Sequence, residues 1–176
     1  MILPGSTQAD ARWFASLGLP FSAADLDHAR AYLAALGYGS DTRIQPVAGW
    51  PEAEQIIRDP HWDRPWWQRE EQERERLVEQ TRTRLGDSVF LERLSAATEL
   101  ATDALHAAAA TAAARGGSAD AALIRAASGA AAMAMHEAAL ARLAYRGSDH
   151  VFMRKYRILE SGRWPLGVLR GVFHLF

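Results

Sequence analysis

Alanine dominates the second half of the chain, and this pattern predicts two long helices. Alanine has the highest intrinsic helix propensity, and the alanine-rich segments run from about 88 to 115 and from about 119 to 145. Between them Gly116-Gly117 breaks the helical pattern, Ser118 is placed to cap the second helix, and Gly147 is placed to end it. Because the connection is short, the two helices should lie antiparallel. We therefore expect an all-α or mainly α fold, a helical bundle built on this hairpin.

Length and composition predict a single helical domain over residues 1–176. The chain is 49% hydrophobic and 23% charged, as expected for a globular domain of this size. We divide it into an N-terminal helical layer (1–58), a connector rich in Trp and Pro (59–67), the central helices (68–147) and a basic, aromatic C-terminal segment (148–176). Periodicity in the last segment leaves two alternatives, a small hairpin or a short helix.

The N-terminal layer is expected to contain three helices. The first covers 6–17. The second begins at Ser22, with Asp25 at the position that completes a capping box. The third covers 51–57 and has a proline in its first turn, where proline is well tolerated. Residues 38–50, rich in Gly, Pro and Asp, are expected to form a loop.

Three tryptophans, Trp62, Trp66 and Trp67, lie in the 59–67 connector together with two prolines. We interpret them as a hydrophobic plug that docks one helical layer on another, and therefore expect all three to be mostly buried. The alternative is an aromatic wall of a ligand pocket. The following stretch, 68–76, pairs Glu with Arg at helical spacing and predicts a solvated helix.

Several classes of function are excluded or disfavoured. The chain has no cysteine, which excludes disulfide scaffolds, Cys-ligated zinc, iron–sulfur clusters and thiol nucleophiles. No apolar stretch is long enough for a transmembrane span, and the first residues lack the basic region of a signal peptide, so we expect a cytoplasmic protein. The net charge of −1 argues against a nucleic-acid partner. Phosphate-binding loops and nucleotide fingerprints are also missing from the sequence.

Basic side chains gather near the C-terminus, where they alternate with aromatic and aliphatic residues: Arg154, Lys155, Arg157, Arg163 and Arg170. Such a segment could attach to a membrane surface. We rank this hypothesis third, because no amphipathic helix of useful length is evident there.

Glu137 is the most informative polar residue. With His136 it lies in a run, 126–141, that otherwise contains only Ala, Met, Gly, Leu and one Ser. At 100° per residue, Glu137 falls in the middle of the apolar face of the helix and His136 falls at the margin. A buried carboxylate without a partner is costly, so we expect Glu137 to be buried and paired with Arg, His or a metal. His136 and Glu137 are therefore the candidate catalytic residues.

A polar stripe on the first of the two central helices supplies candidate metal ligands. Glu99, Asp103 and His106 share one face, and the last two match the carboxylate-x-x-His pair of di-iron bundles. Level pairing across the hairpin would bring Glu99 beside His136. These donors suit a divalent metal of the non-haem iron type. The alternative is a solvent-exposed stripe, because it lies opposite the apolar face of its own helix.

Asp149-His150, just after the second central helix, is a further candidate. An adjacent Asp can orient a His as a general base, although neighbouring loop residues often only solvate each other.

Two hypotheses about function follow. The first is an enzyme that acts on a small molecule within the bundle, with His136 and Glu137 as acid–base groups or metal ligands. The second is a non-catalytic helical module that binds a partner protein, in which Glu137 forms a structural pair. Either function is compatible with a homo-oligomer.

Overall fold

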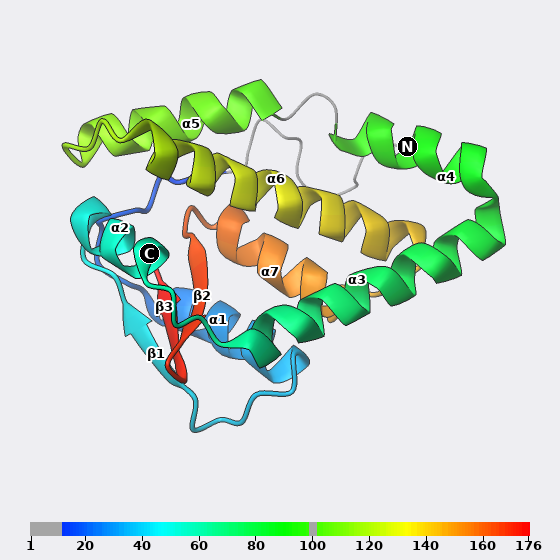
Figure 1. The fold of residues 1–176 in the computed structure, drawn as a ribbon, viewed down its shortest axis with the longest axis horizontal. Coiled ribbons are helices and arrows are strands. Elements are labelled where there is room, and N and C mark those ends of the chain that lie inside the picture. The colour runs from blue at the N-terminus through cyan, green and yellow to red at the C-terminus, as the bar shows by residue number, and fades with distance from the viewer. Residues whose placement is uncertain (1–11, 99–101) are drawn as a thin grey trace.

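The computed structural model describes residues 12–98 and 102–176, with side chains described for all of these except 97 and 98. Within these ranges the fold is mainly α, with seven helices and one small three-stranded sheet (Figure 1). The predicted mainly α class is confirmed. None of the described helices combines the length and apolar character that crossing a membrane requires.

The expected hairpin is formed by α5 (Thr102–Arg115) and α6 (Ala121–Leu143), which pack along each other (Figure 1). Gly116 allows this turn to lie against Trp50, because a Cβ atom there would come within 2.2 Å of the indole ring. The cap of α6 is Asp120 rather than Ser118: its side chain accepts a hydrogen bond of 2.8 Å from the backbone N–H of Leu123. An aspartate at this position accepts a hydrogen bond from a backbone N–H group that has no partner within the helix. Its negative charge is also stabilised by the positive end of the helix dipole.

The single helix expected over 88–115 is described as two helices, α4 (Asp87–Thr98) and α5, on either side of residues 99–101. Both pack on α6. The inner face of α4 is formed by Phe90 and Leu94, which are buried and one helical turn apart. The second central helix ends close to the predicted position, since α6 stops at Leu143, two residues before 145.

In the N-terminal layer, α1 (Ala23–Ala35) begins with the predicted capping box between Ser22 and Asp25. The helix α2 (Trp50–Arg58) follows as expected. The predicted loop between them was wrong in part, because β1 (Arg43–Pro46) joins the sheet. Of the helix expected over 6–17, the described part, from residue 12 onward, forms turns instead.

Helix α3 (Arg64–Leu85) begins inside the predicted connector, and Gly86 separates it from α4. Trp62 and Trp66 are partly buried and pack over Gly167, but Trp67 is 57% exposed. The prediction that all three tryptophans are buried was therefore wrong for Trp67. The physical reason is that Trp66 and Trp67 are consecutive residues of a helix, so they point about 100° apart and only one faces the body.

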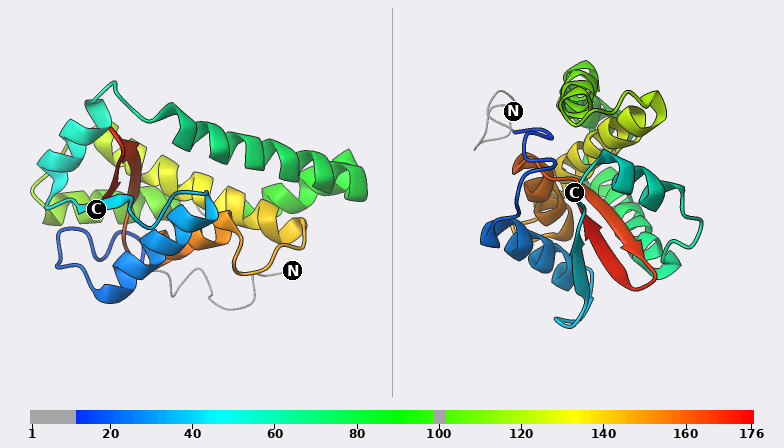
Figure 2. Two further views of the ribbon diagram at one scale, coloured as in Figure 1. Left: turned by 90° about the horizontal axis from the view of Figure 1, so that it is seen from below. Right: turned by 90° about the vertical axis from the view of Figure 1, so that its left-hand side faces the viewer.

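The C-terminal segment contains both predicted alternatives, a helix and a hairpin. Helix α7 (Val151–Glu160) is followed by strands β2 (Pro165–Leu169) and β3 (Val172–Leu175), joined by a tight turn at Arg170-Gly171. Strand β3 pairs antiparallel with β2 and parallel with β1, which gives the order β1-β3-β2. Figure 2 shows this sheet at one end of the molecule, beside α1 and α2.

The basic C-terminal segment is not a basic surface as a whole. Arg163 is only 2% exposed and donates hydrogen bonds to the backbone carbonyls of Ser16, Leu19 and Pro20. It also pairs with Asp25 at 3.2 Å. Arg163 therefore holds the N-terminal turns against α1, and the structure gives no support to the membrane-attachment hypothesis, which relied on this residue.

Candidate functional site

Glu137 is completely buried on α6, and two cations hold its carboxylate. Lys155 of α7 donates to Oε2 at 3.0 Å, while Arg74 of α3 donates to Oε1 through Nη2 at 3.0 Å and through Nε at 3.3 Å. The expectation that Glu137 is buried and paired is confirmed. The lysine partner was not foreseen.

A second buried carboxylate completes this cluster. Glu70 of α3 is 3% exposed, and both of its oxygens lie 2.9 Å from Lys155 Nζ. The hydroxyl group of Tyr32, on α1, donates to Glu70 at 2.6 Å and accepts a 2.9 Å hydrogen bond from the indole N–H of Trp66. We refer to Tyr32, Glu70, Arg74, Glu137 and Lys155 as the buried ion network.

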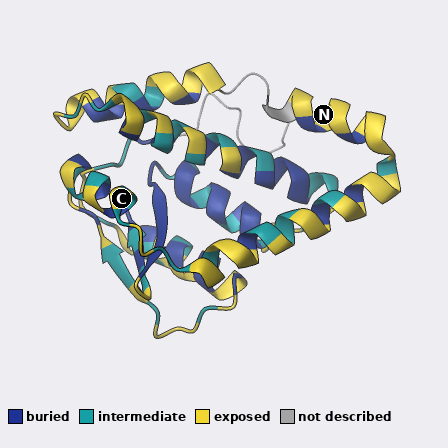
Figure 3. Cartoon of the chain, viewed as in Figure 1, coloured by how far each residue is buried: buried dark blue, intermediate teal, exposed yellow. Residues whose placement is uncertain are grey.

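The network joins four helices, α1, α3, α6 and α7, and pairs two buried carboxylates with two cations; Arg74 also pairs with Glu71, which is partly exposed. Figure 3 shows α7 as a largely buried helix between α6 and α3. Ions removed from water need such pairing and hydrogen bonding to offset the loss of hydration. The network therefore fixes the relative positions of helices that are far apart in sequence.

Burial and charge shift the proton affinities within the network. Burial raises the pKa of Glu137 above its ordinary value, although Lys155 opposes this shift. Burial by itself would lower the pKa of Lys155, but Glu70 and Glu137 outweigh it and the pKa is raised. Burial, followed by the nearby charge of Glu70, raises the pKa of Tyr32 well above its ordinary value. Lys155 is thus held as an ammonium and Tyr32 as a neutral hydrogen-bond donor.

His136 lies outside the hydrogen bonds of this network. It is partly buried on α6, and burial, with a smaller effect of Arg74, lowers its pKa. Within the described part of the chain, the hydrogen bonds of Glu137 go to Arg74 and Lys155 and none goes to His136. The two candidate catalytic residues are neighbours in sequence that face different surroundings.

The candidate metal ligands that the structure describes do not form a metal site. Asp103 and His106 are exposed on α5. Glu99, and with it the predicted contact to His136, lies outside the described residues. Over residues 12–98 and 102–176, no group of three or more His, Cys, Asp or Glu side chains is arranged to hold a metal ion.

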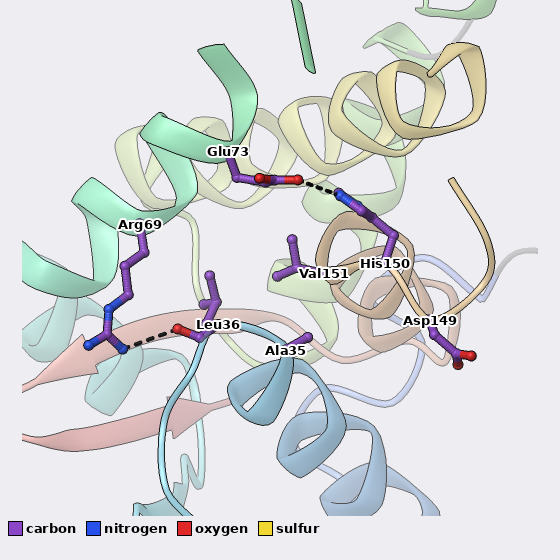
Figure 4. Close-up of a pocket in the computed structure, with 7 residues that line it drawn as sticks. All are labelled: Ala35, Leu36, Arg69, Glu73, Asp149, His150 and Val151. Carbon is purple, nitrogen blue, oxygen red and sulfur yellow. Dashed lines mark hydrogen bonds and ion pairs between the residues drawn. The ribbon is translucent and has the colours of Figure 1, made fainter. Parts of the chain in front are cut away.

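His150 lies at an open surface depression of about 400 Å³ between α1, α3 and the start of α7 (Figure 4). Its Nε2 is 2.7 Å from Glu73, and its Nδ1 accepts a 3.3 Å hydrogen bond from the backbone N–H of Phe152. Because Nδ1 accepts, Nε2 carries the proton and donates to Glu73. Both ring nitrogens are therefore engaged, and His150 caps α7 while linking it to α3.

The adjacent Asp149 does not orient His150, because it pairs with Arg154 at 3.0 Å and its side chain is 84% exposed. The rest of the depression is lined by Ala35, Leu36, Arg69 and Val151. Arg69 donates to the carbonyl oxygen of Leu36 at 3.1 Å (Figure 4). The polar groups here connect helix ends to one another.

The residues that sequence reasoning missed are Tyr32, Glu70, Arg74 and Lys155. Two signals pointed to them. Glu70 and Arg74 precede the predicted inner residue Leu77 by seven and three positions, so they share its helical face. In addition, Lys155 is the only lysine among 20 basic residues.

Comparison with known proteins found no matching family model, no similar curated protein and no similar solved structure. The inference of function therefore depends on the geometry of the residues described above.

Proposed function

We propose that this protein is a non-catalytic helical interaction module, in which Glu137 has a structural role. One observation carries the proposal: Glu137 has no exposed surface, and Lys155 and Arg74 occupy both of its oxygens. A general acid or base must come within about 2.6–3.2 Å of a substrate atom. A carboxylate enclosed by two cations inside a four-helix junction is better suited to holding helices together.

Helix α3, which this network holds, and the next helix, α4, expose apolar side chains that could contact a partner. On α4, Phe90 and Leu94 face the body, while Val89 and Leu91 on its flanks are 37% and 53% exposed. Trp67 on α3 is 57% exposed, and tryptophan is enriched among residues that dominate binding energy. We assign the contact surface to these exposed apolar side chains of α3 and α4, and we expect the partner to be a protein with a complementary apolar surface.

The test is affinity purification of the full chain with quantitative mass spectrometry, using Trp67→Ala and Leu91→Arg. The matched controls change exposed polar neighbours, Gln68→Ala and Glu92→Gln. The proposal expects the same partners to be lost with both apolar variants and kept with both controls. Sedimentation velocity of the same four proteins identifies the case in which the partner is a second copy. Equal partner recovery and equal self-association for all four variants contradict the proposal.

The second candidate function is a small-molecule enzyme that uses His136 and Glu137. Its specific support is the raised pKa of a buried carboxylate, a feature concentrated at catalytic sites. It requires α3 to move so that a substrate reaches Glu137. Metal analysis of the purified protein with an absorption spectrum tests the metal-dependent form, and a Glu137→Gln variant that stays folded tests any activity found.

A further inference from the structure

Lys155 is the only lysine of the chain, and the fold conceals it. Its side chain is 11% exposed, and its ammonium group is held by Glu70 and Glu137. We infer that Lys155 is a concealed acylation site that becomes available to acyl donors when α3 moves away from α6 and α7. This inference does not depend on the proposed function.

Helix α3 covers Lys155 through contacts that are mostly polar. In 22 residues it fully buries only Glu70, Leu77 and Thr81, while Trp66, Val78 and Leu85 are partly buried against the core. The Thr81 hydroxyl is buried without a hydrogen-bond partner among the described residues, which weakens the contact further. Elements with few buried apolar contacts are those that open locally without global unfolding.

The rest of the lysine's surroundings is held much more firmly. Helix α7, which carries Lys155, buries Val151, Phe152, Met153, Tyr156, Ile158 and Leu159 in only ten residues. Helix α6 buries nine apolar side chains in addition to Glu137. Figure 1 shows α3 running along one side of the molecule. Its first turn contacts the sheet through Trp66, which packs over Gly167 of β2. Opening of α3 therefore leaves the lysine on an intact α6–α7 layer.

The opened state has the groups that acyl transfer requires. When α3 leaves, Glu70 and Arg74 leave with it, and Glu137 remains beside Lys155. The ammonium group loses one proton to Glu137, and the neutral amine attacks the carbonyl carbon of a thioester. The C–S bond breaks, the thiolate leaves as a thiol with the second amine proton, and an amide remains. Acylation removes the positive charge of Lys155. On closing, the Glu70 carboxylate would be buried without its ammonium partner, so α3 could not close as before.

The inference is tested with an amine-reactive ester, N-hydroxysuccinimidyl acetate, which is applied to the folded full-length chain near neutral pH. The amine forms an amide bond with the acetyl group, and N-hydroxysuccinimide leaves. Acetylation of Lys155 is followed over time by mass spectrometry of the peptide that contains it. The same chain unfolded in urea gives the rate of an unprotected lysine. The folded protein is expected to react at least about a hundredfold more slowly, because only the open fraction reacts.

Two matched variants separate local opening from global unfolding. Leu77→Ala removes the apolar anchor of α3, and Leu175→Ala removes the same atoms from β3; both leucines are completely buried. Neither residue belongs to the ion network. Acetylation is measured in urea-free buffer, and each free energy of unfolding is measured separately, so that the rates can be compared at known stability.

We expect Leu77→Ala to accelerate acetylation of Lys155 on the order of tenfold or more relative to Leu175→Ala. Equal acceleration by both variants would show that only global unfolding exposes the lysine. Reaction of the parent at the unfolded rate would show that the lysine is not concealed, and no acceleration by Leu77→Ala would show that α3 is not its cover. Each of these three results overturns the inference.

Discussion

Lys155 and Glu137 lie 18 residues apart in sequence, on consecutive helices, and their charged atoms are 3.0 Å apart in the interior. The ion pair links α7 to α6 in the interior of the protein. Since Glu70 of α3 contacts the same ammonium group, one lysine side chain determines how three helices meet. Such a pair is costly to break from one side, because the remaining ion is left in a poorly hydrated environment.

Replacing Glu137 with Gln is expected to lower the free energy of unfolding by about 1–3 kcal/mol at neutral pH. The amide keeps the volume of the side chain but offers Lys155 and Arg74 only one acceptor oxygen, so one of these donors loses its bond to residue 137. Lys155 still pairs with Glu70, and Arg74 still pairs with Glu71. Urea denaturation followed by circular dichroism measures the change. The control is Glu75→Gln, which alters an exposed glutamate of α3 and should change stability by less than about 0.5 kcal/mol. Equal stability of the two variants would remove Glu137 from the structural core.

Replacing Lys155 with Met tests the cation of the same pair. Two buried carboxylates then share one site without the ammonium group, so we expect a loss of about 3–5 kcal/mol and uptake of a proton by one carboxylate on folding. Potentiometric measurement of proton uptake on refolding detects this proton. If the variant folds with unchanged stability and no proton uptake, the two carboxylates are not held by Lys155.

The raised pKa of Glu137 predicts how stability depends on pH. A carboxyl group whose pKa is higher in the folded state binds protons more tightly when folded, so its contribution to stability increases as the pH falls through that folded pKa. The increase is complete below the pKa of the unfolded state, which is near the ordinary value of 4.5. The Glu137→Gln variant lacks this term. The stability of the parent should therefore rise relative to that of the variant on acidification, and a constant difference from pH 8 to pH 5 would contradict the assignment.

Asp25 shows the opposite behaviour in a lower pH range. Its pKa is lowered: burial opposes this shift, but hydrogen bonds from Ser22 and the ion pair with Arg163 outweigh it. The stability that it contributes is present above the unfolded pKa, near 3.8, and is lost as the pH falls through the lower, folded value. Comparing the parent with Asp25→Asn below pH 4 measures this loss. The difference between the two proteins should shrink there, and a difference that grows would contradict the sign.

Much of the helical architecture could be predicted because it depends on local signals. The capping box at Ser22 and Asp25, the glycine break at 116–117 and the alanine content of α6 each act within a few residues. Glu137 could be placed in the core because helical periodicity alone determines which residues share a face. For the same reason the burial of Glu137 was predictable without knowledge of its partners.

The pairing of Glu137 with Lys155 and Arg74 could not be predicted, since it depends on long-range packing. Glu70 and Arg74 lie in a stretch of alternating Glu and Arg, whose composition predicts a solvated helix. Only the docking of α3 on α6 turns two of these side chains inward. Strand β1 was missed for a similar reason, because a four-residue strand is stabilised by its pairing with β3 near the C-terminus and carries little local signal.

Arg163 is expected to be as important for stability as the buried ion network. Its guanidinium group donates to three backbone carbonyls and to Asp25, and it lies 4.0 Å from the centre of the Phe21 ring. Replacing it with Met leaves these acceptors buried or partly buried without a donor, which should cost about 3–5 kcal/mol. Thermal unfolding measures the effect. The control Arg170→Met changes an arginine whose side chain is 65% exposed and should have little effect.

Iodide quenching of tryptophan fluorescence tests the position of α3. Trp50 and Trp164 are 3% exposed, whereas Trp67, near the start of α3, is 57% exposed. An exposed indole ring is accessible to iodide, so Trp67→Phe should remove a large part of the quenchable emission. The control Trp164→Phe should remove emission that iodide barely quenches. If both variants lose the same quenchable fraction, Trp67 does not lie on the surface. Helix α3 would then be rotated, and Glu70 would no longer face Lys155.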